Sequence, residues 1–154
     1  RKEADEIIHA SPVLPGVMDM IGQARENGLQ VAIASSSPHS WVDTHANRLG
    51  IFHYFDHIIC ADDVPPGKTK PNPDIFLKAL EQLNVKNDAS IVFEDSLNGV
   101  LAARRAGIFV VAVPNPLTAK MGVSGDVTVS SLAGLSLQEL SVNIERMSRV
   151  SSNA

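Results

Sequence analysis

The sequence predicts an α/β fold, a doubly wound parallel sheet with helices on both faces. Short apolar runs alternate along the chain with segments of helical periodicity, which is the pattern of repeated strand, helix and strand units. The apolar runs are continuous, as expected when helices cover both faces of the sheet. The 154 residues, 44% hydrophobic and 19% charged, fit one compact domain with a full core.

Each element of this fold follows from a local pattern. Strands are predicted from the apolar runs at 29–36, 55–61, 90–95 and 107–114. Helices are predicted at 15–28, 38–49, 73–83 and 97–106, the first with Pro15 at its entry and Gly28 at its exit. The tail, 127–150, predicts one short strand and a final amphipathic helix, in which apolar residues recur at near-helical spacing: Leu137, Leu140, Ile144 and Met147.

Composition excludes several classes of protein. The net charge of -4 and the lack of a basic stripe with interleaved aromatics argue against nucleic-acid binding and favour a small-molecule partner. A single cysteine, Cys60, excludes a disulfide framework and favours a reducing cytoplasm. No apolar run approaches the roughly 18 residues of a membrane helix, so no membrane partner is expected.

Polar side chains stand where the predicted strands end. Ser35 to Ser37 close the first strand, Glu94 and Asp95 close the third, and Lys70 lies in the loop after the second. Ligands of doubly wound sheets bind outside the carboxyl ends of the strands. Hydroxyls, a cation and paired acids are complementary parts of a site for phosphate and metal.

The paired acids predict a magnesium site. Magnesium prefers oxygen ligands and is commonly held by one or two carboxylates plus substrate phosphate. Asp95, short and at the very strand end, is the better direct ligand, whereas Glu94 would bind through water or orient its neighbour. The alternative is that an acid and Ser96 only cap the next helix, where negative charge is favourable by about 0.3–1 kcal/mol. Two acids exceed what one cap needs.

The serines and Lys70 predict a phosphate site. Ser35 to Ser37 precede Pro38, which suits a first helical turn, so free N–H groups and hydroxyls would meet an anion there. An ordinary N-cap is the alternative. Lys70 is followed by two prolines and Asn72, read as a cap, so its loop is predicted to be stiff and its ammonium aimed. The alternative is a solvated loop lysine like Lys68.

Together these motifs resemble the haloacid dehalogenase-like superfamily, and most closely its beta-phosphoglucomutase-like branch of sugar-phosphate phosphatases and mutases. The stretch VAIASSS is similar to the second motif, which makes Ser35 the phosphate-binding hydroxyl and Ser36 its supporting neighbour. KPNPDIF is similar to the third motif and assigns Lys70 to holding the phosphoryl group. EDSLNG is similar to the fourth and assigns Asp95 to Mg2+ with Glu94 in support. The resemblance implies a Rossmann-like core.

One departure from the family pattern concerns the nucleophile. The family's first motif, DxD after an N-terminal strand, supplies the aspartate that attacks phosphorus, and no DxD ends a predicted strand here. The resemblance places that missing strand in the middle of the sheet, between the strands carrying Ser35 and Asp95, and a helical cap before Leu14. Residues 1–12 are interpreted as the end of the cap with a linker, and 13–154 as a partial core domain.

The resulting hypothesis is a magnesium-dependent phosphatase of small phosphorylated metabolites such as sugar phosphates. It would act through an aspartyl-phosphate on an upstream aspartate, so residues 1–154 alone are predicted to be inactive. A phosphomutase and a non-catalytic module that binds a phosphorylated ligand are the alternatives. A receiver-like signalling domain carries similar side chains, but its acids come first and its lysine last, which is not the order found here.

Other polar residues are interpreted as structural. The five histidines, His9, His39, His45, His53 and His57, show no metal-like pairing and are read as surface or half-buried residues. Asp62 and Asp63 are read as a loop pair, and Asp43 as a surface or cap residue. Cys60 is expected to be a buried small apolar group. Arg104 and Arg105 are placed on the solvated side of their helix.

Overall fold

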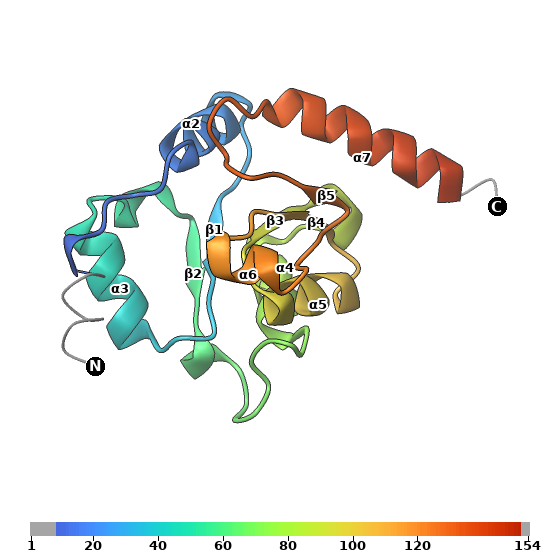
Figure 1. The fold of residues 1–154 in the computed structure, drawn as a ribbon. Coiled ribbons are helices and arrows are strands. Elements are labelled where there is room, and N and C mark those ends of the chain that lie inside the picture. The colour runs from blue at the N-terminus through green and yellow to red at the C-terminus, as the bar shows by residue number, and fades with distance from the viewer. Residues whose placement is uncertain (1–8, 152–154) are drawn as a thin grey trace.

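The computed structural model of the chain describes residues 9–151. Its strands are all parallel and form two sheets (Figure 1). One sheet pairs β1 (Ala32–Ala34) with β2 (His57–Ile59). The other has the order β3 (Ile91–Glu94), β4 (Phe109–Ala112) and β5 (Val127–Thr128). The predicted α/β class with parallel strands is confirmed.

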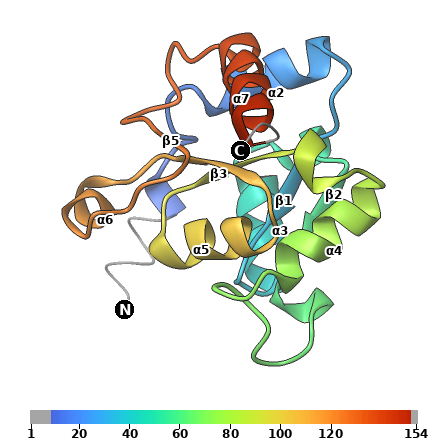
Figure 2. The ribbon, with the colours of Figure 1, turned by 90° about the vertical axis from the view of Figure 1, so that its right-hand side faces the viewer.

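Helices cover both faces of the sheets. Figure 2 shows α2 (Val17–Glu26) and α7 (Leu137–Ser151) on one side and α4 (Asp74–Leu83) and α5 (Leu97–Arg105) on the other. The remaining helical segments are α3 (His39–Arg48), the short α6 (Pro116–Lys120) and single 3-10 turns, of which η2 (Ala61–Asp63) follows β2. The predicted helices at 15–28, 38–49, 73–83 and 97–106 are therefore confirmed to within two residues at their ends. Helix α6 was not predicted.

The core explains why the strand at 107–114 reads as a continuous apolar run. Val110 and Ala112 pack in the cluster that includes α5, whereas Val111 packs in the cluster that includes Met20 of α2 and Leu140 of α7. All three strand residues are fully buried. Because alternate side chains point to opposite faces and both faces are covered, every position is apolar.

Strand β1 is shorter than predicted. The sequence predicts a strand over 29–36, but only Ala32–Ala34 are paired, and only with β2. Within residues 9–151 no strand lies between β1 and β3. Because β1 has a partner along one edge alone, half of its backbone groups lie outside the ladder.

Helix α7 buries the apolar face that the sequence predicts. Leu137 and Leu140 of α7 are buried and Ile144 is half-buried, as their spacing predicts, whereas the side chain of Met147 lies outside the described residues. The predicted cap end and linker at 1–12 fall mostly outside residues 9–151, so that boundary stays a prediction. None of the helices in the described range combines the length and the hydrophobicity of a membrane span.

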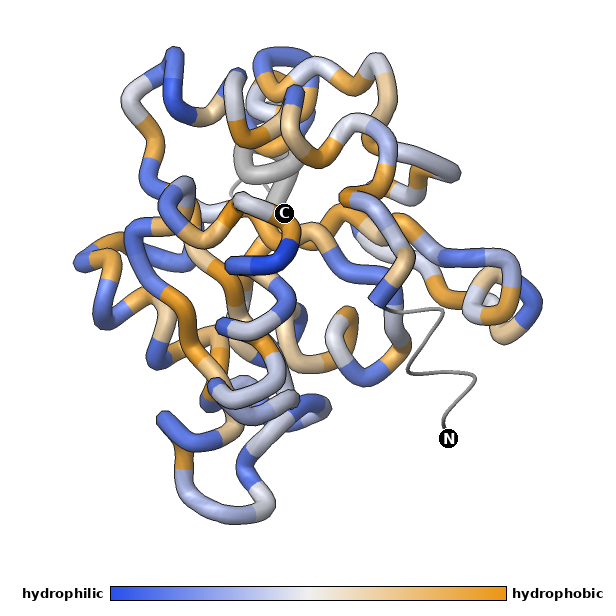
Figure 3. Tube along the Cα trace, turned by 90° about the vertical axis from the view of Figure 1, so that its left-hand side faces the viewer, coloured by the Kyte–Doolittle hydropathy of each residue, from blue (hydrophilic) through white to orange (hydrophobic). Residues whose placement is uncertain are grey.

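The loop between β2 and α4 protrudes from the carboxyl edge of β1 and β2. Figure 3 shows this loop at the bottom of the molecule as a largely hydrophilic stretch. It includes η2 and continues through residues 64–73 to α4. The loop brings Lys70 back to the same edge at which the serines follow β1.

Candidate active site

The serines occupy the turn from β1 into α3. The Ser35 N–H donates to the Ile59 carbonyl (2.9 Å), which continues the strand pairing by one residue. The Ser35 hydroxyl accepts the Ser37 N–H (3.2 Å), and α3 then begins at His39 with Pro38 at its N-cap. Ser35 is half-buried and Ser36 is exposed. The serines thus stand at a helix N-terminus, as predicted.

Lys70 reaches from its loop to the ends of both sheets. Its Nζ donates to the Ala34 carbonyl at the end of β1 (2.8 Å) and pairs with the Glu94 carboxylate at the end of β3. The ammonium also lies 4.8 Å from the centre of the Phe76 ring, within cation–π range. Its side chain is only 12% exposed. Lys70 is therefore aimed inward, whereas Lys68 is exposed.

Glu94 is held in place by its own neighbours. One carboxylate oxygen pairs with Lys70, and the other accepts the Ser96 hydroxyl (3.2 Å), which also accepts the Gly99 N–H (3.0 Å) and so caps α5. A Cβ at Gly99 would collide with the Glu94 carboxylate. Ser96 therefore caps α5, which is the alternative role predicted for this motif. Glu94 instead holds the Lys70 ammonium in place.

Asp95, the next residue, has a partner outside this network. Its carboxylate is exposed and accepts a 3.4 Å hydrogen bond from the Asn115 side-chain amide. Asn115 also caps α6, because its Oδ1 accepts the N–H groups of Leu117 and Thr118. Sequence reasoning missed Asn115, although an asparagine before Pro116 at a strand end is a recognisable helix start.

The side chains of three residues, Ser36, Asn72 and Arg105, hold the loop that carries Lys70. Its own N–H donates to the Ser36 hydroxyl (3.2 Å), so Ser36 binds the loop. Asn72 was predicted to be a cap, but Pro73 is the N-cap of α4, and the Asn72 amide instead donates to the Gly67 and Thr69 carbonyls within the loop. The third side chain, Arg105 of α5, donates to the carbonyl of Pro71, the residue after Lys70.

That contact joins α5 to the lysine loop. The Arg105 guanidinium donates to the Pro71 carbonyl at 2.7 Å, across 34 residues of sequence. Arg105 is exposed, as its helical position predicts, but no local pattern predicts a partner for it in this loop. The predicted stiffness of the loop thus has a tertiary source in addition to its prolines.

Asp95 and Glu94 fit the part of a magnesium site that protein side chains supply. Magnesium is commonly bound through one or two carboxylates together with substrate phosphate and water. Asp95 offers an exposed carboxylate at the strand end, and Glu94 orients Lys70 beside it. Among residues 9–151, no three side chains of His, Cys, Asp or Glu are grouped so that they could hold a metal ion by themselves.

A cavity of about 980 Å³ lies between the two sheets. Its lining is mostly apolar and comes from β1, β3, α2, α4 and α7, including Ala32, Ala34, Ile91, Phe93, Met20 and Leu137. Glu94 also lines it, at the edge where Lys70 binds. The cavity thus occupies the position at which the resemblance places the missing strand.

Comparison with known proteins agrees with this geometry. The family model of the haloacid dehalogenase-like hydrolases matches residues 2–107. YhcW of Bacillus subtilis is 43% identical over 104 residues, which cover 68% of this chain and 46% of that protein. A phosphorylated carbohydrates phosphatase of Thermotoga maritima is 39% identical over 94 residues, 61% of this chain and 43% of that protein.

A solved structure of beta-phosphoglucomutase from Clostridium difficile matches the fold. It superposes with a TM-score of 0.78 and 26% identity over 92% of this chain and 62% of that one. The chain therefore belongs to the haloacid dehalogenase-like hydrolase family, and its similarity to beta-phosphoglucomutase agrees with the predicted branch. The chain spans about half the length of the curated relatives it matches.

Proposed function

We propose that the protein carrying this chain is a cytoplasmic, magnesium-dependent phosphatase of small phosphorylated metabolites such as sugar phosphates. The observation that carries the proposal is the position of Lys70, whose ammonium joins the ends of β1 and β3. The family match and the similarity to a phosphatase of phosphorylated carbohydrates support it. The single unpaired Cys60 supports a reducing compartment.

The proposal gives each site residue a role. Ser35 donates its hydroxyl to a phosphoryl oxygen, and Ser36 holds the lysine loop through its contact with the Lys70 N–H. Lys70 neutralises charge on the equatorial oxygens of the phosphoryl group. Asp95 binds Mg2+, with Glu94 in support through Lys70. The bound cation would neutralise further charge on the phosphate.

The nucleophile is proposed to come from a strand outside residues 9–151. An aspartate at the end of that strand would attack phosphorus and displace the substrate oxygen. That oxygen would take a proton from the second aspartate of the same DxD motif and leave as the hydroxyl of the product. Water would then hydrolyse the aspartyl-phosphate and release inorganic phosphate. The apolar cavity between β1 and β3, with Lys70 and Glu94 at its carboxyl edge, supports this placement.

A phosphomutase is the second candidate. The similarity to beta-phosphoglucomutase favours it, because a mutase uses the same intermediate and differs only in the acceptor. In a phosphatase water attacks the aspartyl-phosphate, whereas in a mutase a substrate hydroxyl does so. The choice between a phosphatase and a mutase therefore depends on whether water or a substrate hydroxyl reaches the aspartyl-phosphate.

One experiment separates these candidates. The full-length protein is incubated with Mg2+ and a panel of hexose and pentose phosphates, and the products are followed by 31P NMR. A phosphatase releases inorganic phosphate from one or more sugar phosphates, whereas a mutase moves the phosphate between positions of the sugar without release. Binding without either reaction would identify a non-catalytic phosphate-binding module and would contradict the proposal.

A further inference from the structure

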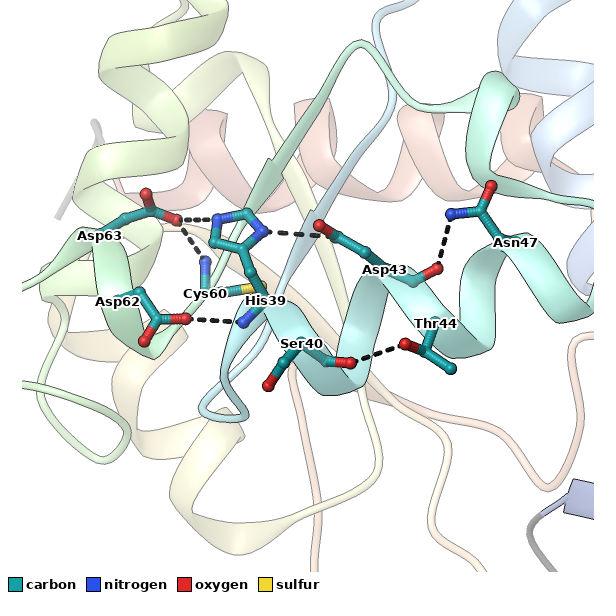
Figure 4. Close-up of polar contacts among 8 residues, drawn as sticks. All are labelled: His39, Ser40, Asp43, Thr44, Asn47, Cys60, Asp62 and Asp63. Atoms are coloured by element: carbon teal, nitrogen blue, oxygen red, sulfur yellow. Dashed lines mark hydrogen bonds and ion pairs between the residues drawn. The ribbon is translucent and has the colours of Figure 1, made fainter.

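A histidine between two carboxylates joins the start of α3 to the turn after β2 (Figure 4). The His39 Nε2 lies 2.8 Å from Asp63 Oδ2, and its Nδ1 lies 3.3 Å from Asp43 Oδ1. Asp43 belongs to α3 itself, whereas Asp63 ends η2, 24 residues from His39. The imidazole thus connects two segments that are distant in sequence.

Backbone hydrogen bonds join the same two segments. The N-cap of α3 is Pro38, which has no side-chain cap to offer, and the His39 N–H instead donates to the Asp62 carboxylate (2.6 Å). The Ala61 N–H donates to the Ser37 carbonyl (3.0 Å). These contacts place η2 directly against the serine loop, so a shift of one segment would have to move the other.

Both segments carry residues of the site. The serine loop, Ser35 to Ser37, is separated from His39 at the start of α3 by Pro38 alone, and η2 opens the loop that leads to Lys70. We propose that His39 is a positioning residue for phosphate binding, because its bridge between Asp43 and Asp63 fixes the serine loop relative to the start of the lysine loop. The inference rests on the proposed function and adds a residue that touches no reacting atom.

The charges around His39 make the bridge depend on pH. Hydrogen bonding to Asp43, and then to Asp63, raises the pKa of His39 above 6.5 against the opposing effect of burial. A protonated imidazole donates from both nitrogens and can satisfy both carboxylates at once, whereas a neutral one donates from only one. The double bridge is therefore complete below the raised pKa and is lost as pH rises through it.

Asp63 stays ionised over the pH range in which His39 titrates. The Cys60 N–H, donating to the Asp63 carboxylate, and then His39 lower the pKa of Asp63 below its usual 3.8. Lys78 of α4 acts on Asp63 in the same direction. Two further ionisable groups of the described residues lie beside the bridge: Asp62 of η2, whose carboxylate accepts the His39 N–H, and the buried Cys60 thiol. The titration of His39 itself thus decides the upper pH limit.

The first test measures the contact between the loops and needs no activity. In the full-length protein at pH 6, amide hydrogen exchange of Ala61 reports its hydrogen bond to Ser37. We expect His39→Asn and Asp63→Asn each to speed exchange several-fold, and the double variant to be no faster than the faster single variant. Asp43→Asn is the matched control, since it removes a partner on the same helix, and should have less effect. Exchange in His39→Asn equal to that in His53→Asn would overturn the inference.

The second test measures binding of inorganic phosphate in the presence of Mg2+ at pH 6 and pH 8.5. The ratio of the Kd of His39→Asn to that of the wild type cancels the titration of phosphate itself. This ratio should be several-fold at pH 6 and smaller at pH 8.5, where the neutral imidazole keeps only one of its two donors, and a ratio that is the same at both would overturn the positioning role. If Lys70→Ala binds phosphate like the wild type, the proposed function fails, and the exchange data alone then support or overturn the bridge.

Discussion

Lys70 and Glu94 form an ion pair in which the two side chains are only 12% and 8% exposed. Glu94 ends β3, and Lys70 also binds the Ala34 carbonyl at the end of β1, so one ammonium connects strands that belong to separate sheets. A charge this well buried needs its partner, because removing one member leaves the other uncompensated. The pair therefore fixes the lysine at the edge of the cavity where we propose that phosphate binds.

Lys70→Ala should lower turnover of the full-length protein by about 10²–10³-fold, the cost of removing one group that stabilises transition-state charge. Lys68→Ala is the matched control and should be nearly silent, because Lys68 is exposed in the same loop. Lys70→Arg should also be poor, since a planar fork does not replace a point charge in a confined site. Steady-state rates of phosphate release provide the measurement, and similar rates for Lys70→Ala and Lys68→Ala would make Lys70 a structural lysine.

Asp95→Asn should weaken Mg2+ binding and lower activity by several orders of magnitude, because it removes a charged ligand. Glu94→Gln should cost less, about 10–100-fold, the usual effect of a residue that acts through a ligand's surroundings. Isothermal titration with Mg2+ alone checks the binding without any assay of turnover. Equal Mg2+ affinity in the wild type and Asp95→Asn would refute the assignment of the ligand.

Gly99→Ala should destabilise the fold by about 1–3 kcal/mol, the usual cost of overpacking. The new Cβ would collide with the Glu94 carboxylate, which is held between Lys70 and Ser96. Gly22→Ala is the control, because a Cβ there meets no atom within 4 Å in the middle of α2. That variant should be more stable by about 0.5–1 kcal/mol. Urea unfolding compares the two, and an equal response of both variants would contradict the predicted collision.

Cys60 should be unreactive in the folded protein. The residue has 0% exposure, and burial, followed by the charges of Asp43, Asp63 and Asp62, raises the pKa of its thiol to about 11. Because the thiolate is the reactive form, about one molecule in a thousand would be reactive at pH 8. The reaction with a disulfide reagent at pH 8 should be slow in buffer and complete at once in urea. Fast labelling of the native protein would show that the thiol is accessible.

Residues 1–154 produced alone should hydrolyse no phosphomonoester and should unfold with low cooperativity. The inner edges of β1 and β3 have no strand between them in the described residues, and open backbone edges and apolar side chains line the cavity there. Adding an upstream segment with the proposed strand should restore cooperative unfolding and Mg2+-dependent turnover. The assay uses para-nitrophenyl phosphate, and robust turnover of the short chain that Asp95→Asn abolishes would place the nucleophile inside these residues.

The sequence alone determined the order of the elements and all of the longer helices, although α6 is not among its predictions. Continuous apolar runs located β3 and β4, and prolines and glycines located the helix ends, because these signals act over a few residues. Strand ends also indicated where Ser35, Lys70 and Asp95 would gather, since parallel strands end at one edge. The lengths of β1 and β2 were overestimated, because pairing depends on neighbours that a local pattern does not contain.

Only the tertiary structure decided how the site is held together. Ser36 binds the lysine loop, Arg105 binds Pro71, and His39 bridges to Asp63, across 34, 34 and 24 residues of sequence. In their own segments Arg105 and His39 look like ordinary surface residues, and Ser36 is predicted only as a neighbour of the phosphate-binding Ser35. Their partners are set by the register of β1 with β2 and by the packing of α5 beside the lysine loop, and such long-range geometry leaves no periodic trace in the sequence.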